Sequence, residues 1–165
     1  MNELDKYLVP YTISQIVSIV FLIAAWKRTR WARWLFSVLF FWASATNMYT
    51  GLTNPDSYLD NARLAIPLYR DFINGWFSDY NHLIIPLIAV GQFMIAIGMM
   101  LRGWWVSLAC IGSMIFLIGI SPLMVGSAFP FPITVSVAAW LIFLHDDKNL
   151  IWKKAIGHSI KDLTV

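Results

Sequence analysis

Two amide side chains are the polar groups most deeply embedded in apolar sequence. Gln92 lies in the middle of the run at residues 83–101, and Asn47 lies in the second half of the run at residues 34–52. An amide inside an apolar segment is costly unless it is hydrogen-bonded. Asn47 and Gln92 can pair across two helices as packing groups, or they can line a polar pocket. Both interpretations stay open from the sequence.

Ionisable residues with possible chemistry gather between residues 54 and 82. Arg70 could form a weak surface ion pair with Asp71, or it could turn inward and bind an anionic head group or a carboxylate. Asp71, Asp79 and His82 are the candidate acid–base groups of an enzyme, and His82 can titrate near neutral pH. Tyr49, just before this segment, is a further candidate for polar contact with a ligand.

The sequence predicts no metal site and reveals no cofactor motif. No carboxylate follows His82 by three or four residues, and His145 and His158 are predicted on the other side of the membrane. The one cysteine, Cys110, cannot form an internal disulfide or a CxxC pair. No P-loop, dinucleotide fingerprint, nucleophile elbow or zinc-protease motif is present. A bound quinone or lipid would need no such motif.

The elements that must position these residues are apolar helices. Of the residues 59% are hydrophobic and 13% are charged, against about 25% charged in soluble domains. Five apolar runs, at residues 9–26, 34–52, 83–101, 104–125 and 131–144, predict an all-α integral membrane helical bundle. The first run spans about 27 Å as a helix, close to the ~30 Å of the hydrocarbon layer. The last run is short enough to be re-entrant, but a full span gives a consistent topology.

The charge distribution predicts the orientation of the bundle. Lys27, Arg28, Arg30 and Arg33 follow the first run at once, and cations favour the cytoplasmic side. This order is the reverse of a signal peptide, so the first run is predicted to be a retained span with the N-terminus outside. The tail at residues 146–165 is then cytoplasmic, with a short interfacial helix that carries Leu150, Ile151, Trp152 and Ile156. The net charge of +3 is too small to argue for nucleic acid.

The segment at residues 54–80 is predicted to be an amphipathic cover over the outer end of the bundle. Asn54 and Pro55 are typical of a helix start. One helix face should carry the apolar side chains and the opposite face the polar ones. The apolar set is Leu68, Phe72, Ile73, Trp76 and Phe77, and the set expected to project away is Tyr69, Arg70, Asp71 and Asn74.

Three stretches resemble the DoxX-like family of small bacterial membrane proteins. They are ARWLFSVLFFWASATNMYTGLTNP, LYRDFINGW and NHLIIPLIAVGQFMIAIGMMLRG. The resemblance implies a four-helix core in a bacterial cytoplasmic (inner) membrane, with the first span here as an extra N-terminal helix. The family name comes from a subunit of a thiosulfate:quinone oxidoreductase, and other members are linked to redox stress partners. Gln92 stands where many relatives carry Glu, so proton chemistry is lost there, but an amide can still orient a quinone or lipid carbonyl.

Three functions remain open. The first is an accessory or redox-associated subunit that binds a quinone or lipid-like molecule through Asn47, Tyr49, Arg70 and Gln92, in a pocket open to the outer leaflet. The second is a membrane enzyme acting on a lipid or small apolar substrate. The third is a purely structural assembly subunit without a pocket. Membrane lipid is the expected partner in each case, with partner subunits or a second copy of the chain as further candidates.

Overall fold

The computed structural model describes residues 3–63, 65–123 and 129–152, and every regular element among them is helical. The all-α prediction is therefore confirmed. The elements in chain order are α1 Glu3–Lys27, α2 Thr29–Thr53, η1 Pro55–Arg63, α3 Pro67–Phe72, η2 Ile73–Phe77, α4 Ser78–Met100, α5 Trp104–Ile120, η3 Ser121–Leu123 and α6 Phe131–His145.

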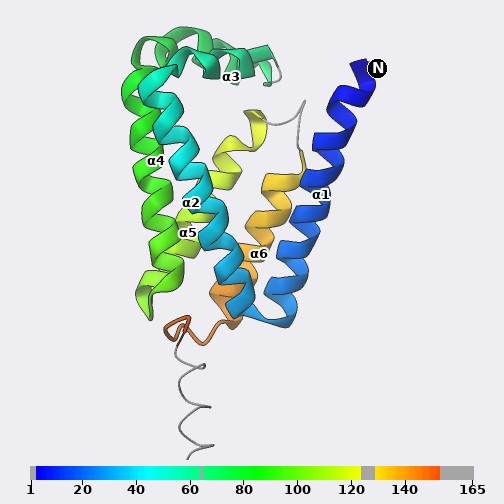
Figure 1. Cartoon of the computed structure of the whole chain (residues 1–165), viewed down its shortest axis with the longest axis vertical. Coiled ribbons are helices and arrows are strands. Elements are labelled where there is room, and N and C mark those ends of the chain that lie inside the picture. Colours follow the sequence, from blue (N-terminus) through cyan, green and yellow to red (C-terminus); the bar gives the residue numbers. More distant parts are fainter. Residues whose placement is uncertain (1–2, 64, 124–128, 153–165) are drawn as a thin grey trace, which may run out of the picture.

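The long helices α1, α2, α4, α5 and α6 run side by side along the molecule, and η1, α3 and η2 lie across one end as an outer layer (Figure 1). Helix α2 packs on α4, α4 on α5, α5 on α6, and α6 on α1. Their shared core contains Phe36, Phe40, Val106, Val135 and Ile142, each at most 1% exposed. The outer layer has a small core of its own, formed by Ala62, Ala65 and Ile73.

Helices α2 and α4 approach each other closely because small residues line their contact. A Cβ added to Gly51 would lie 2.9 Å from side-chain atoms of Ile85 and Pro86. The hydroxyl of Ser44 donates to the carbonyl of Ala89 at 2.7 Å on the same interface. Small residues allow such contact between helix backbones, so the two amide-bearing helices are held in a fixed register.

Arg33 is fully buried at the other end of the bundle, where it joins α2 to α4 and to the segment after α6. Its guanidinium donates to the carbonyls of Met99, Leu101 and Asn149 at 2.8, 2.6 and 2.8 Å. It also forms an ion pair with the buried carboxylate of Asp146 at 2.9 Å. Met99 and Leu101 lie at the end of α4, where carbonyls lack partners within the helix. Arg33 is thus a core residue in addition to being one of the cations that follow the first run.

A second ion pair joins the same two segments at the surface. Arg30 Nη2 lies 2.8 Å from Asp147 Oδ2, and the Asp147 side chain is half exposed. Burial acts to raise the pKa of this carboxyl, but hydrogen bonds from Asn149 and Arg30 outweigh it and bring the pKa below its ordinary value of 3.8. The ionised form of Asp147 is therefore the one that the fold stabilises.

Three of the helices begin well before the predicted runs, and α4 does so at Ser78 instead of 83. Helix α1 begins before residue 9, and α2 begins at Thr29 instead of 34. The fourth run ends earlier as a regular helix, at Ile120 followed by η3, and residues 124–125 lie outside the described part. The fifth run matches α6 to within one residue. Residues 146–152 form no helix, and the remainder of the predicted tail helix, including Ile156, lies outside the described residues.

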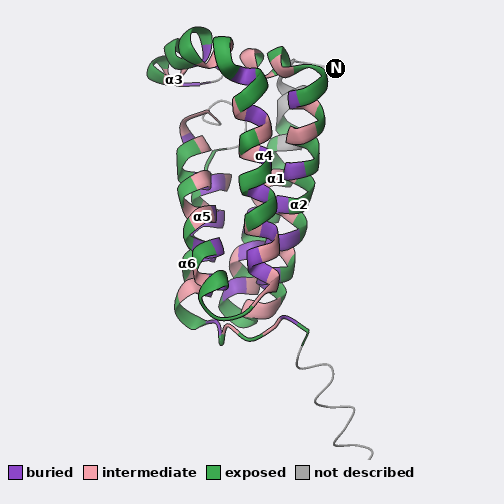
Figure 2. Cartoon of the chain, turned by 90° about the vertical axis from the view of Figure 1, so that its left-hand side faces the viewer, coloured by how far each residue is buried: buried purple, intermediate pink, exposed green. Residues whose placement is uncertain are grey.

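Two of the described helical stretches are long and apolar enough to cross a membrane: Pro67–Met100, with 34 residues, and Trp104–Leu123, with 20. Tyr11–Lys27 and Phe131–His145 are apolar but shorter. Exposed residues run along the whole length of the bundle's sides (Figure 2), and many of them are large and hydrophobic.

The outer layer differs from a single amphipathic helix. Pro55 begins η1 as predicted, and Ile73 is buried, but Leu68 and Trp76 of the same predicted face are 73% and 57% exposed. The prediction that Tyr69 projects away was wrong, because it packs on the outer-layer core and its hydroxyl donates to the carbonyl of Gly119 at 2.9 Å. Segment η2 follows α3 directly and is kinked at Gly75, whose φ and ψ of −101° and −113° are not helical. A single helical periodicity therefore does not continue through it.

Candidate functional site

A cavity of about 400 Å³ lies within the bundle beneath the outer layer. Helices α2, α4, α5 and α6 form its walls, and residues of η1, η2 and η3 line its outer end. Its lining residues are Leu39, Phe40, Trp42, Ala43, Asn47, Tyr58, Asn61, Phe77, Ile85, Ile88, Gln92, Phe116, Leu117, Ile120, Leu123 and Phe131. This set contains no ionisable acid or base other than tyrosine. The volume falls within the roughly 300–1,000 Å³ of small-molecule sites.

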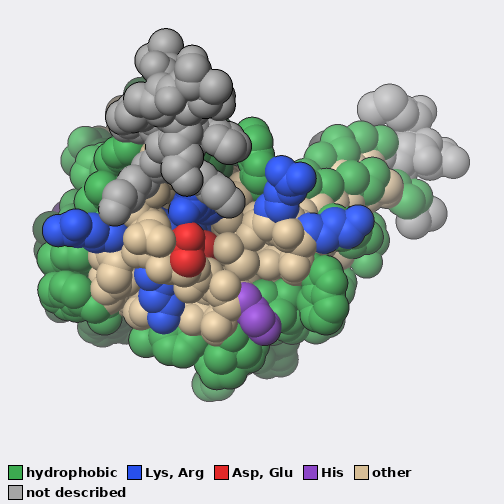
Figure 3. Space-filling model, turned by 90° about the horizontal axis from the view of Figure 1, so that it is seen from below, with side chains coloured by type: hydrophobic (Ala, Val, Ile, Leu, Met, Phe, Trp, Pro, Cys, Tyr) green, Lys and Arg blue, Asp and Glu red, His purple; other side chains and the backbone are tan. Residues whose placement is uncertain are grey.

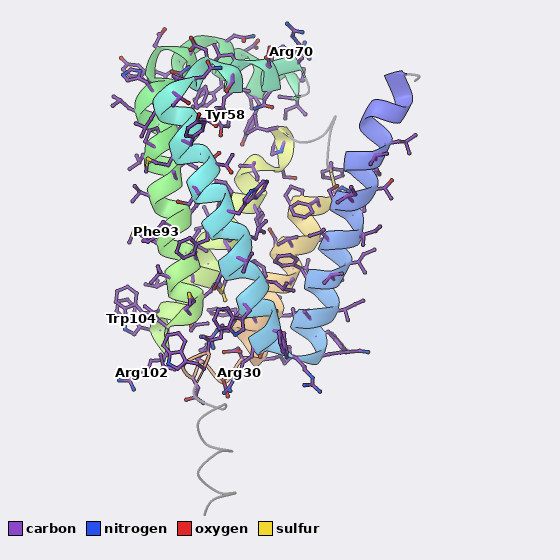
Figure 4. The ribbon with its side chains drawn as sticks, in the orientation of Figure 1. Arg30, Tyr58, Arg70, Phe93, Arg102 and Trp104 are labelled. Atoms are coloured by element: carbon purple, nitrogen blue, oxygen red, sulfur yellow. The ribbon has the colours of Figure 1, made fainter. Side chains whose placement is uncertain are left out.

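A chain of hydrogen bonds crosses one wall of the cavity. The hydroxyl of Tyr58 in η1 donates to Asn47 Oδ1, and Asn47 Nδ2 donates to Gln92 Oε1 at 2.7 Å. Figure 4 shows Tyr58 beneath the outer layer and close to α2. The two interpretations of the amides are therefore compatible, since Asn47 and Gln92 pair across α2 and α4 and also line the cavity.

The hydrogen bonds run from Tyr58 through Asn47 to Gln92, and this direction leaves N–H donors on Gln92. Burial raises the pKa of Tyr58 above its ordinary value of 10.0, so the phenol stays protonated and can donate. Asn47 then accepts with its oxygen and donates with its nitrogen. Gln92 accepts through Oε1, so its Nε2 keeps N–H groups for which no described residue supplies an acceptor. Gln92 is 2% exposed and lines the cavity, so a molecule bound in the cavity can accept from these donors.

The remainder of the cavity is apolar and rich in aromatic rings. Phe40 of α2 and Phe116 of α5 meet edge to face, with ring centroids 5.9 Å apart. Phe131 from the start of α6 completes this side. Aromatic and aliphatic walls with a few placed polar groups are the usual lining of sites for apolar ligands. A bound molecule here would contact rings on most sides and hydrogen-bond donors on one.

Two of the predicted ligand-binding residues lie away from the cavity. Tyr49 is 71% exposed and is not among the lining residues. Arg70 is exposed in the outer layer (Figure 4), where its Nε donates to the carbonyl of Ala62 at 3.2 Å. Arg70 lines a separate shallow depression together with Asp60 and Arg63. The structure therefore brings Asn47 and Gln92 together and leaves Tyr49 and Arg70 outside.

The candidate acid–base residues also lie apart from the cavity. Asp71, Asp79 and His82 are all exposed, and none of them lines it. Within the described ranges, no group of three His, Cys, Asp or Glu side chains could hold a metal ion.

Tyr58 and Asn61 are the polar lining residues that the sequence analysis did not identify. They lie three positions apart in η1, so a 3₁₀ turn places them on the same side. That spacing was a usable signal. Their position over the cavity depends on how η1 folds back across the bundle, and the local sequence gives no sign of that.

Comparisons of this chain with protein-family models, with curated proteins and with solved structures found no match.

Proposed function

We propose that this chain is a membrane-spanning, DoxX-like accessory subunit that binds a quinone or another lipid-like molecule through a carbonyl oxygen. The observation that carries the proposal is the buried amide of Gln92, which has unused N–H donors in an otherwise apolar cavity. A ligand that offers a carbonyl and is apolar elsewhere matches both properties of this site.

The surface of the bundle supports the membrane location. On α1 alone, Ile13, Ile16, Ile19 and Ile23 are each at least half exposed. Contiguous apolar surface on this scale is unusual for a protein in water, whereas lipid accommodates it. In this proposal all five long helices cross the inner membrane, and the outer layer lies on the side of the N-terminus.

The cavity supports binding rather than catalysis as the role of this chain. The enzyme alternative needs acid–base groups at the ligand, but Asp71, Asp79 and His82 are exposed and separate from the cavity. The structural alternative needs no cavity, yet a cavity is present around Gln92. We therefore propose that the chain holds the ligand for a partner subunit that performs the redox chemistry.

The test is mass spectrometry of the quinones and lipids that co-purify with the full-length chain. Gln92→Leu should abolish retention of the ligand because the donors are lost. Phe93→Leu is the matched control, since Phe93 is the next residue on α4, does not line the cavity and is 45% exposed. It should retain the ligand at the level of the unmodified chain.

A second variant guards against a folding defect in Gln92→Leu. That substitution leaves Asn47 Nδ2 without its acceptor, which costs about 1–3 kcal/mol for a buried group. The double variant Asn47→Leu/Gln92→Leu removes both amides. It takes the acceptor only from the hydroxyl of Tyr58, which is half-buried, and it should fold without retaining ligand. Retention by a folded double variant at the level of Phe93→Leu would overturn the proposal, as would the absence of any carbonyl-bearing apolar molecule from the unmodified chain.

A further inference from the structure

A hollow of about 690 Å³ lies at the end of the bundle opposite the outer layer. It forms where the turn between α1 and α2 meets the residues after α6. Arg28, Arg30, Trp31 and Trp34 line one side, and His145 and Asp147 the other. Figure 3 looks onto this end of the molecule, where Lys and Arg side chains surround a small acidic area.

The arginines of this hollow have unused hydrogen-bonding capacity. Arg30 Nη2 is paired with Asp147, but Arg30 Nη1 is buried and has no hydrogen-bond partner among the described residues. A buried donor without an acceptor is costly, so an additional oxygen at this point would be stabilising. Arg28 is exposed and forms no ion pair with a described residue. Together the two guanidiniums outweigh the single carboxylate by one charge.

The aromatic residues indicate where the hollow lies relative to a bilayer. Trp31 and Trp34 are 62% and 39% exposed although they belong to a packed helix. Tryptophan is enriched at the level of the lipid headgroups, where its ring contacts acyl chains and its N–H reaches polar groups. Arginine binds phosphate oxygens in a bidentate manner. Tryptophan beside arginine at one depth therefore matches a lipid phosphate and the start of its chains.

We propose that this hollow binds the phosphate of an anionic phospholipid from the leaflet at the arginine-rich end. The site is separate from the central cavity and takes a ligand of different chemistry, a phosphate anion in place of a neutral carbonyl. The inference rests on the proposed membrane location and is independent of the proposed quinone-like ligand.

Native mass spectrometry of the full-length chain in non-ionic detergent tests this site. The chain is titrated with phosphatidylglycerol, with phosphatidylcholine, and with inorganic phosphate. Phosphatidylglycerol should bind more tightly than phosphatidylcholine, and inorganic phosphate should not displace it. Arg28→Gln and Arg30→Gln should each weaken phosphatidylglycerol binding roughly fivefold, the effect of one cation near an anionic surface. Because Arg28 is exposed and has no ion pair to lose, Arg28→Gln remains informative if Arg30→Gln fails to fold.

Two further variants sharpen the result. Asp147→Asn removes the negative charge but keeps an acceptor for Asn149, so it should strengthen phosphatidylglycerol binding roughly fivefold. Arg102→Gln removes a cation from the same end of the bundle but outside the hollow, and it should leave binding unchanged.

Four outcomes would overturn the inference. Equal binding of the two lipids would show that the site has no selectivity for an anionic phospholipid. Equal weakening by Arg102→Gln and Arg28→Gln would reduce the effect to general surface charge. Displacement by inorganic phosphate that depends on Arg28 would make the hollow a site for free anions. A chain that partitions into water in a detergent phase-separation assay would refute the membrane location, and with it both proposals, whereas failure of the titration alone would leave the quinone-like ligand untouched.

Discussion

Replacing Arg33 with methionine removes the most deeply buried charge in the described part of the chain. Methionine has an unbranched apolar side chain that can occupy much of the same space. The substitution removes the donor of three backbone carbonyls and the counter-ion of Asp146, whose Oδ1 keeps only the backbone N–H of Lys148. Asp146 is 8% exposed and its Oδ2 has no hydrogen bond among the described residues even in the intact structure.

The expected loss follows from the uncompensated carboxylate. Removal of one partner from a buried ion pair typically costs about 3–5 kcal/mol. For a chain of this size, 1 kcal/mol shifts the melting temperature by about 2–4 °C. Arg33→Met should therefore lower the melting temperature by roughly 6–20 °C, measured by circular dichroism in detergent. Arg33→Lys should lie between, because an ammonium restores the charge but cannot match four acceptors from one planar group.

A double-mutant cycle separates the ion pair from the other contacts of Arg33. Asp146→Leu alone leaves Arg33 buried without its anion, and Arg33→Met/Asp146→Leu removes both charges. The double variant should be more stable than the sum of the two single losses predicts, since neither charge is left alone. The interpretation is that Arg33 stabilises the contact between α2, α4 and the segment after α6. Stability losses of the two single variants that add up to the loss of the double variant would refute it, as would a change in melting temperature of less than 2 °C for Arg33→Met.

Three further predictions concern other parts of the bundle. Gly98→Ala should destabilise the chain by about 1–3 kcal/mol in chemical unfolding, because its Cβ would lie 2.8 Å from a side-chain atom of α5. Gly91→Ala is the control, since its Cβ meets nothing within 4 Å and the change should be neutral or stabilising. Equal effects of the two substitutions would contradict the close α4–α5 contact. Because the pKa of Asp147 is lowered in the folded chain, its contribution to stability is complete at a pH above the ordinary pKa of 3.8 and is lost as the pH falls below that value. Asp147→Asn should therefore flatten the acid limb of a stability–pH curve. An unchanged limb would count against the ion pair with Arg30. Cys110 is fully buried and should react with a maleimide only after unfolding; labelling of the folded chain would contradict its position in the core.

The sequence predicted the long helices well because apolar runs are the direct signal of buried or lipid-facing helices. It missed the start of α2, since Arg30 and Arg33 interrupt the apolar pattern. The partner that neutralises Arg33 lies 113 positions away, at Asp146. No local sequence pattern reveals such a pair. The start of α2, which carries Arg33, was therefore interpreted as a surface turn.

The candidate site was predictable where a polar group interrupts an apolar run, as Asn47 and Gln92 do. Tyr58 was missed because its segment is polar overall and only the tertiary fold lays it over the cavity. Helical periodicity predicted that Tyr69 and Arg70 both project away, but only Arg70 is exposed, whereas Tyr69 packs on the outer-layer core. The outer layer is irregular, and η2 is kinked at Gly75. The direction in which a side chain points therefore cannot be predicted there from the spacing of residues.

The hydrogen bonds and the ion pair of Arg33 also determine when the bundle is completed during synthesis. The ribosome makes Arg33 long before Asp146 and Asn149, and α1, α2, α4, α5 and α6 all precede these two residues in the chain. Until the final part of the chain emerges, the end of the nascent bundle carries a cation without its counter-ion. A chain released before residue 146 would contain every helix of the bundle and still lack the contacts that close one end of it.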